Sequence, residues 1–170
     1  MSMALISTVT VGAGGAASID FNAIAGTFTD LVVLVSARNV ATTNPTVEIK
    51  LNSASATASE KYIYGDGASA SGGNNTALYG VVDYNPNTAS TFGNMQIYIP
   101  NYAGTTAKVV SVDAVTESNA TAAVQKLTTS IFGSSAVTSV NIISANGNFA
   151  QYSSASLYGI IKGSGGASVA

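Results

Sequence analysis

Apolar and polar residues alternate with a period of two in several short segments, and this pattern constrains the fold most strongly. The alternation is clean in Val47–Leu51 and Met95–Ile99, and it continues in Val110–Asp113 and Val140–Ile142. Side chains that alternate in this way point to opposite faces of a β-strand, so one face meets a core and the other meets water or a partner. Leu31–Val35 is continuously apolar, which predicts a central strand covered on both faces.

Residues that favour turns separate these segments into short strands. Asn146-Gly147 favours a hairpin turn most strongly, because both residue types tolerate positive φ. Ala120–Lys126 has some helix propensity but no apolar stripe, so we expect a strand or a single turn there. We expect strands near residues 4–11, 16–21, 29–37, 46–52, 60–65, 77–84, 93–100, 107–115, 124–132, 137–144 and 148–160.

About eleven short strands at this spacing predict an all-β fold, either a sandwich or a barrel, and we expect an antiparallel β-sandwich. The 170 residues fit one domain over 1–170, since domains typically have about 100–200 residues. Segments 53–59 and 68–76 are of low complexity and are expected to be exposed loops. The tails at about 1–5 and 163–170 are expected to be flexible or held by a partner.

The residue types that are absent restrict the chemistry. The chain has no Cys and no His, so it lacks the thiol nucleophile, the usual general base at neutral pH and the commonest metal ligand. Its eight acidic residues form no cluster in the sequence, although two carboxylates could still face one another in space. We therefore expect a protein that is not an enzyme and uses no cofactor.

Charged residues make up 8% of the chain, against about 25% in an average globular protein. A nearly neutral surface protects poorly against self-association, and it is tolerable where copies of the chain or a larger assembly cover it. Six scattered basic residues and a net charge of −2 argue against a nucleic-acid partner. No apolar run is long enough for a membrane helix, and the first residues do not resemble a signal peptide.

One segment partly matches a calcium-binding loop. Asp83, Asn85 and Asn87 occupy the first three ligand positions of such a loop. Thr88 stands where the loop needs Gly, and Asn94 stands where it needs Glu. We therefore expect no metal here and prefer a turn in which Asn side chains cap the backbone.

Tyrosine is the main aromatic residue, with eight Tyr against five Phe and no Trp. Tyrosine suits interfaces because it combines apolar area with a polar tip, so the rim of the core or a subunit interface is the favoured interpretation. A sugar-binding platform is a weaker alternative, because Trp is missing. Candidate interface or ligand residues in the loops are Tyr84, Asn85, Asn87, Tyr102 and Tyr152.

Several segments together resemble small jelly-roll surface proteins of tailed bacteriophage virions. These are Phe92-Gly93-Asn94 followed by Ile97–Tyr102, the Asn146-Gly147 turn with Phe149, and Ala155–Ile160 near the end of the chain. The likeness spans most of 28–160 and contains no active-site motif. It implies a jelly-roll sandwich and indicates no functional residues.

The resemblance implies a capsid decoration, or cement, protein on the outer surface of the virion. Its partners would be the major capsid protein and other copies of itself, most simply in a homotrimer. The first alternative is a tail-fibre or head-fibre tip that binds a host-surface glycan through loops 66–76 and 85–91. The second alternative is a cellular carbohydrate-binding module.

Overall fold

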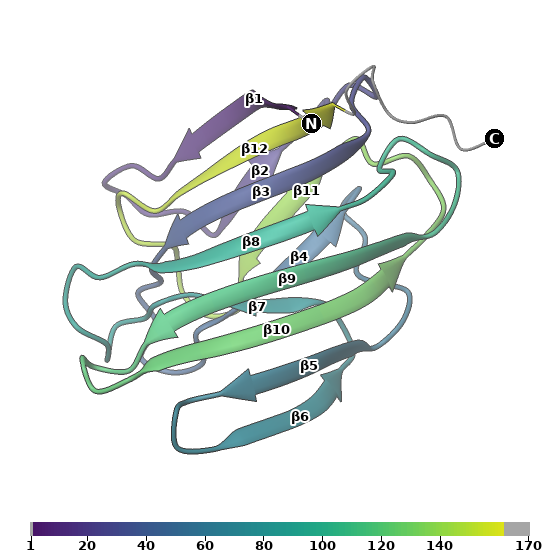
Figure 1. Cartoon of the computed structure of the whole chain (residues 1–170). Coiled ribbons are helices and arrows are strands. Elements are labelled where there is room, and N and C mark those ends of the chain that lie inside the picture. The colour runs from purple at the N-terminus through teal and green to yellow at the C-terminus, as the bar shows by residue number, and fades with distance from the viewer. Residues whose placement is uncertain (1, 162–170) are drawn as a thin grey trace.

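The computed structural model describes residues 2–161, and these residues form twelve strands (Figure 1). The tail expected at 163–170 lies outside the described residues. The strands are β1 (Ser2–Thr10), β2 (Ser18–Phe21), β3 (Asp30–Ala37), β4 (Thr46–Leu51), β5 (Glu60–Gly65), β6 (Ala70–Asn75), β7 (Tyr79–Val81), β8 (Gly93–Ile99), β9 (Lys108–Glu117), β10 (Ala123–Phe132), β11 (Val140–Ser144) and β12 (Ser154–Ile161).

The strands form two antiparallel sheets that pack face to face, which confirms the predicted all-β sandwich. The larger sheet has eight strands in the order β1-β12-β3-β8-β9-β10-β5-β6, and the smaller has four in the order β2-β11-β4-β7. Strands far apart in the sequence pair in a nested way: β4 with β7, β3 with β8, β2 with β11 and β1 with β12. The hairpins β5–β6 and β9–β10 are inserted into this nested set and widen the larger sheet.

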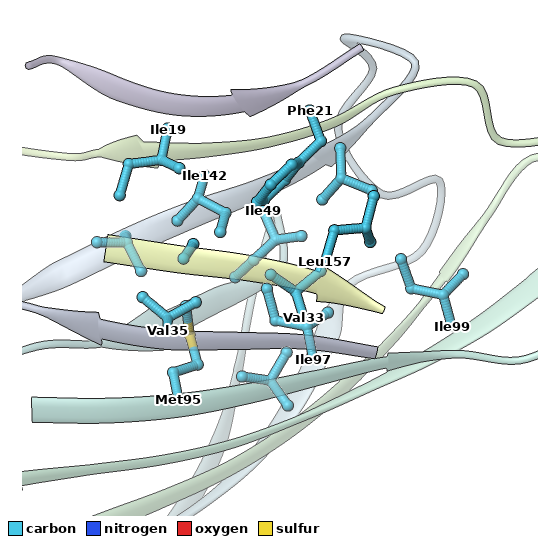
Figure 2. Close-up of a cluster of buried hydrophobic side chains, with 14 of the residues drawn as sticks. Ile19, Phe21, Val33, Val35, Ile49, Met95, Ile97, Ile99, Ile142 and Leu157 are labelled. Atoms are coloured by element: carbon cyan, nitrogen blue, oxygen red, sulfur yellow. The ribbon is translucent and has the colours of Figure 1, made fainter. Parts of the chain in front are cut away.

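Aliphatic side chains from both sheets fill the space between them (Figure 2). Each buried face follows the period-two pattern, as in β4, where Val47, Ile49 and Leu51 are buried and the residues between them are not. Figure 2 shows side chains of the two sheets meeting between the layers, among them Ile19, Phe21, Val33, Val35, Ile49, Met95, Ile97, Ile142 and Leu157. Burying one such side chain contributes about 1.5–3 kcal/mol, so this layer supplies most of the driving force.

Four sequence-based expectations were wrong. Residues 68–76 are not wholly loop, because Ala70–Asn75 pair with β5 as an exposed edge strand. Residues 2–5 are not a tail, since they pair with β12 as part of β1. The expected strand at 148–160 begins only at Ser154, because Tyr152 has a φ of 72° in the preceding turn. Asn146-Gly147 bends the chain but makes no hairpin, because β11 and β12 belong to different sheets.

β3 is central, as predicted, but its outer face is only partly covered. Val32 is 6% exposed, whereas Leu34 on the same face is 41% exposed. The inward residues Leu31 and Val33 are completely buried. The chain therefore leaves an aliphatic side chain of its most apolar strand open on the outside of the sandwich. The segment 53–59 is a loop, as predicted.

The sandwich has two distinct ends. Ser2 and Ile161 pair at one end, toward which the β12 arrow points in Figure 1. The loops 11–17, 38–45, 82–92 and 145–153 meet at the opposite end, and hydrogen bonds join them to one another, as from the Val40 amide to the Asn148 carbonyl (2.9 Å). We call this opposite end the loop end. It holds most of the residues that the sequence singled out.

A test of the sheet packing is Gly93→Ala at the start of β8. A Cβ at Gly93 would lie 2.8 Å from the Asp83 backbone nitrogen and 2.9 Å from the Val115 carbonyl oxygen. Because both neighbours are backbone atoms, we expect the variant to lose about 1–3 kcal/mol of unfolding free energy in urea. Gly133→Ala is the matched control, since nothing lies within 4 Å of its Cβ. Equal stability of the two variants would contradict the packing described.

Candidate interaction surface

In the middle of β10, between the buried Val124 and Phe132, the alternation is inverted relative to an ordinary half-buried strand. Its polar residues Lys126, Thr128 and Ser130 are 4–5% exposed and point toward the inside. Its aliphatic residues Leu127 and Ile131 are 44% and 41% exposed on the outer face. A strand that hides its polar side chains and exposes its apolar ones is unfavourable in water unless the outer face is covered. The inversion therefore marks the outer face as a candidate interaction surface.

Neighbouring strands add two further exposed aliphatic side chains to this face, next to the polar residues Asp113 and Ser111 of β9. Ile63 of β5 lies directly opposite Leu127, and Val109 of β9 lies directly opposite Ile131. Ile63 is 64% exposed and Val109 is 56% exposed. We call Ile63, Val109, Leu127 and Ile131 the outer patch. A hollow of 460 Å³ beside it is lined by Ile63, Val115 and Leu127, among others, so a partner would meet a recessed apolar surface.

On the inner face of the same strands, a buried ion pair replaces apolar packing. Lys126 Nζ lies 2.9 Å from Glu60 Oε1 and donates a second hydrogen bond to the Tyr79 carbonyl oxygen at 3.0 Å. Glu60 also accepts hydrogen bonds from the side-chain amide of Asn75 (2.6 Å) and from the Tyr79 backbone (2.5 Å). Glu60 is 0% exposed, so these four contacts compensate the loss of water around both charges.

Arg38 organises the loop end from inside. Its guanidinium donates hydrogen bonds to the carbonyl oxygens of Asn85, Asn87, Thr88 and Thr91 at 2.8–3.2 Å. The planar guanidinium presents five donors in a fixed arrangement, which suits a set of converging carbonyl groups. The loop 85–91 is thus held to β3 by one buried side chain.

Two carboxylates hold the same loop to β9. Asp83 Oδ1 accepts hydrogen bonds from Asn87 Nδ2 (3.1 Å), the Glu117 amide (3.0 Å) and the Thr116 hydroxyl. The Glu117 carboxylate accepts from the amides of Ala120 and Thr88. The hydrogen bond from the Ala120 amide contributes most to lowering the pKa of Glu117 below its ordinary value of 4.5. Burial opposes this effect, and the hydrogen bonds from Thr88 and Thr91 lower the pKa further. Glu117 accepts through both of its oxygens and Asp83 through Oδ1, in each case from donors of this chain.

The structure separates the five candidate residues. Tyr102 is 0% exposed at the end opposite the loops, where its hydroxyl donates to the Ala25 carbonyl and accepts from the Phe28 amide (3.2 Å), so its assignment as a surface residue was wrong. Asn87 is 8% exposed and its side chain holds the loop instead of capping its own backbone. Tyr84 is half-buried and Asn85 is exposed at the loop end.

Tyr152 is strongly exposed, with 70% of its surface open to solvent. Its φ of 72° is uncommon for a bulky residue, and its amide donates to the Val11 carbonyl oxygen at 2.9 Å. The turn thus presents the ring outward at the loop end. Tyr152 remains a candidate contact residue. It lies in the loop between β11 and β12, whereas the outer patch lies on β5, β9 and β10.

Sequence reasoning missed the outer patch and the Glu60–Lys126 pair. An alternating segment predicts a strand whichever face is buried, so it could not show that β10 turns its polar residues inward. One signal was available in the neighbouring β5 segment. When Ile63 is paired with Leu127, Glu60 of β5 and Lys126 of β10 fall on the same face of the sheet. Charged residues on the same face of two adjacent strands indicate a polar layer between the sheets.

Within residues 2–161 no group of three or more acidic residues lies close enough together to hold a metal ion. The same residues contain no helix that could cross a bilayer. Comparison of the chain with protein-family models, with curated proteins and with solved structures yields no match.

The lowered pKa of Glu117 predicts how stability depends on pH. The folded state favours the ionised carboxylate, so its contribution is present above the ordinary pKa of 4.5 and is lost as the pH falls through the lower folded value. Urea unfolding of the wild type should therefore show falling stability below pH 4.5, and Glu117→Gln should reduce that dependence. Asp66 contributes in the same direction, so the difference between the two proteins isolates Glu117. Parallel pH curves would contradict the assignment.

The buried ion pair predicts strongly coupled substitutions. Lys126→Met leaves the Glu60 carboxylate buried without its cation and should cost about 3–5 kcal/mol of unfolding free energy. The double variant Glu60→Gln with Lys126→Met removes both charges and should recover much of that loss. Urea unfolding of the wild type, both single variants and the double variant gives the coupling energy. Additive losses would show that the two side chains do not depend on one another.

Proposed function

We propose that this chain is a non-enzymatic structural protein of a tailed-phage virion, a capsid decoration protein that binds the outside of the shell. One observation carries the proposal: β10 buries Lys126, Thr128 and Ser130 while leaving Leu127 and Ile131 exposed. This arrangement is favourable when another protein covers the outer face. The resemblance of the sequence to small phage surface proteins supplies the identity of that partner, the major capsid protein.

We also infer that the sandwich is a jelly roll. Without the two inserted hairpins, eight strands remain, in the rows β1-β12-β3-β8 and β2-β11-β4-β7. Their nested pairs describe one long antiparallel ribbon rolled into two sheets, which supports a double-sheet jelly roll. The hairpins β5–β6 and β9–β10 then become additions to one sheet, and the outer patch lies on these additions.

Attachment to a shell would use this surface in a specific way. Aliphatic side chains gain free energy by leaving water at about 25 cal/mol per Å², without the cost of desolvating charges. A single contact of this kind can be modest, because many equivalent positions on a lattice raise the overall affinity when subunits are linked. A homotrimer would provide that linkage at a threefold position of the shell.

The polar groups support a structural role over a catalytic one. Glu60, Asp83 and Glu117 each accept several hydrogen bonds from backbone or amide donors of the chain itself. A catalytic carboxylate has to present an oxygen to a substrate. Both oxygens of Glu60 and Glu117 are engaged in holding strands and loops together, and Asp83 is 1% exposed.

The experiment is cosedimentation of the purified protein with phage shells that lack it. Wild type should bind saturably at a fixed copy number and raise the thermal stability of the shell. Ile63→Asp with Leu127→Asp puts two charges into the outer patch and should weaken binding at least about tenfold, since burying each unpaired charge costs more than 1.4 kcal/mol. Asn146→Asp at the loop end is the control and should bind like the wild type.

Two results would count against the proposal. The first is absence of saturable shell binding by folded wild-type protein. The second is binding that the outer-patch variant retains and the Asn146→Asp control loses, which would place the contact at the loop end. Sedimentation equilibrium of the free protein tests the trimer separately.

A further inference from the structure

A groove opens on the inner face of the larger sheet, where β5 and β6 extend beyond the smaller sheet. β7 is the edge strand of the smaller sheet, and in Figure 1 β5 and β6 lie below it. The groove has a volume of 340 Å³, within the roughly 300–1,000 Å³ of small-molecule sites. The side chains that matter for its chemistry are Tyr62, Tyr64, Ser71, Asn75, Val81 and Lys126.

The ring of Tyr62 lies across the groove in a fixed position. A Cβ at Gly73, its partner on β6, would lie 2.7 Å from the Tyr62 hydroxyl oxygen and 2.9 Å from Cζ, so the ring rests directly on the Gly73 backbone. Lys126 Nζ lies 4.9 Å from the centroid of the same ring, within range of a cation–π contact. Glycine at position 73 thus makes room for the ring, which Lys126 approaches from β10 while Tyr62 stays partly exposed to solvent.

Unused hydrogen-bonding groups surround this ring. Among residues 2–161 no hydrogen bond involves the Tyr62 or Tyr64 hydroxyl. Burial contributes most to raising the pKa of Tyr64, so that hydroxyl stays protonated. Lys126 uses two of its three donors, on Glu60 and Tyr79. Asn75 donates through its amide nitrogen and keeps its amide oxygen available.

We propose that this groove binds a neutral saccharide. A sugar ring has an apolar face of C–H groups, which suits an aromatic ring, and a rim of hydroxyls that both donate and accept hydrogen bonds. Lys126 and Glu60 neutralise one another, so the groove offers no net charge to an anion. A fixed aromatic ring with hydroxyl, amide and ammonium groups around it matches this chemistry better than it matches an apolar peptide.

The site goes beyond attachment to a shell and does not depend on it. It lies on the inner face of β5, whereas the outer patch lies on the outer face of the same strand. Tyr62 and Ile63 are adjacent in the sequence and point to opposite faces. Residues 70–75, expected as a glycan-binding loop, contribute Ser71 and Asn75 to the groove as part of an edge strand.

The test is an NMR titration of the ¹⁵N-labelled full chain with a panel of glucose, galactose, N-acetylglucosamine and their α- and β-linked tetrasaccharides. At least one member should cause saturable shifts of amide signals confined to β5, β6, β7 and Lys126. Tyr62→Ala should weaken that binding about tenfold, because it removes the stacking surface. Ser71→Phe should also block binding, from an exposed position that leaves the core untouched.

Ile63→Asp is the matched control. It should bind the saccharide like the wild type. It should bind phage shells more weakly than the wild type, because it puts a charge into the outer patch. Tyr62→Ala should keep shell binding, so failure of one proposal is distinguishable from failure of the other. No saturable shift with any member of the panel, or shifts that Tyr62→Ala and Ser71→Phe leave unchanged, would overturn the saccharide site.

Discussion

A sheet of four strands can cover only part of a sheet of eight, and the rest of this structure depends on how the chain resolves that mismatch. Where the sheets overlap, the inner face of the larger sheet is aliphatic, as at Val33 and Ile97. Where the overlap ends, at β10 and β5, the inner face becomes polar and the Glu60–Lys126 pair takes over. An uncovered aliphatic inner face would be unstable in water, so the change in side-chain type follows the change in cover.

The same mismatch explains why the aliphatic residues of β10 and β5 appear on the outside. A strand has two faces, and once the inner one is polar its apolar residues lie on the other. The two faces of the sheet formed by the inserted hairpins therefore differ in chemistry. The outer patch is aliphatic, whereas the groove combines tyrosine rings with hydrogen-bonding groups. This layer is where we place both proposed activities of the molecule.

The fold was largely predictable from the sequence, because most strands have one face in the aliphatic core and their alternation reports it. β4 is the clearest case. β6 was missed because nearly all its residues are exposed, so no alternation develops in Ser71, Gly72 and Gly73. The hairpin expected at Asn146-Gly147 was wrong because a turn signal is local. β11 belongs to the smaller sheet and β12 to the larger one, and pairing with strands far away in the sequence decides this.

The candidate residues were less predictable. Tyr102 follows Pro100 and Asn101 in what looks like an exposed turn, but its ring is fully buried and its hydroxyl holds the Ala25 segment. Tyr62 lies within a strand and was not singled out, although its partner Gly73 frees the space for its ring. That role depends on cross-strand register, which the sequence does not display.

The place of β12 between β1 and β3 has a consequence for synthesis of the chain on the ribosome. β3 emerges long before β12, which is one of its two neighbours. Translation at about 5–20 residues per second leaves the apolar β3 with an open edge until residues 154–161 have been made. Such an edge templates pairing between chains. A message cut short before Ser154 would therefore yield a nascent chain that lacks β12 and carries an adhesive β3 edge.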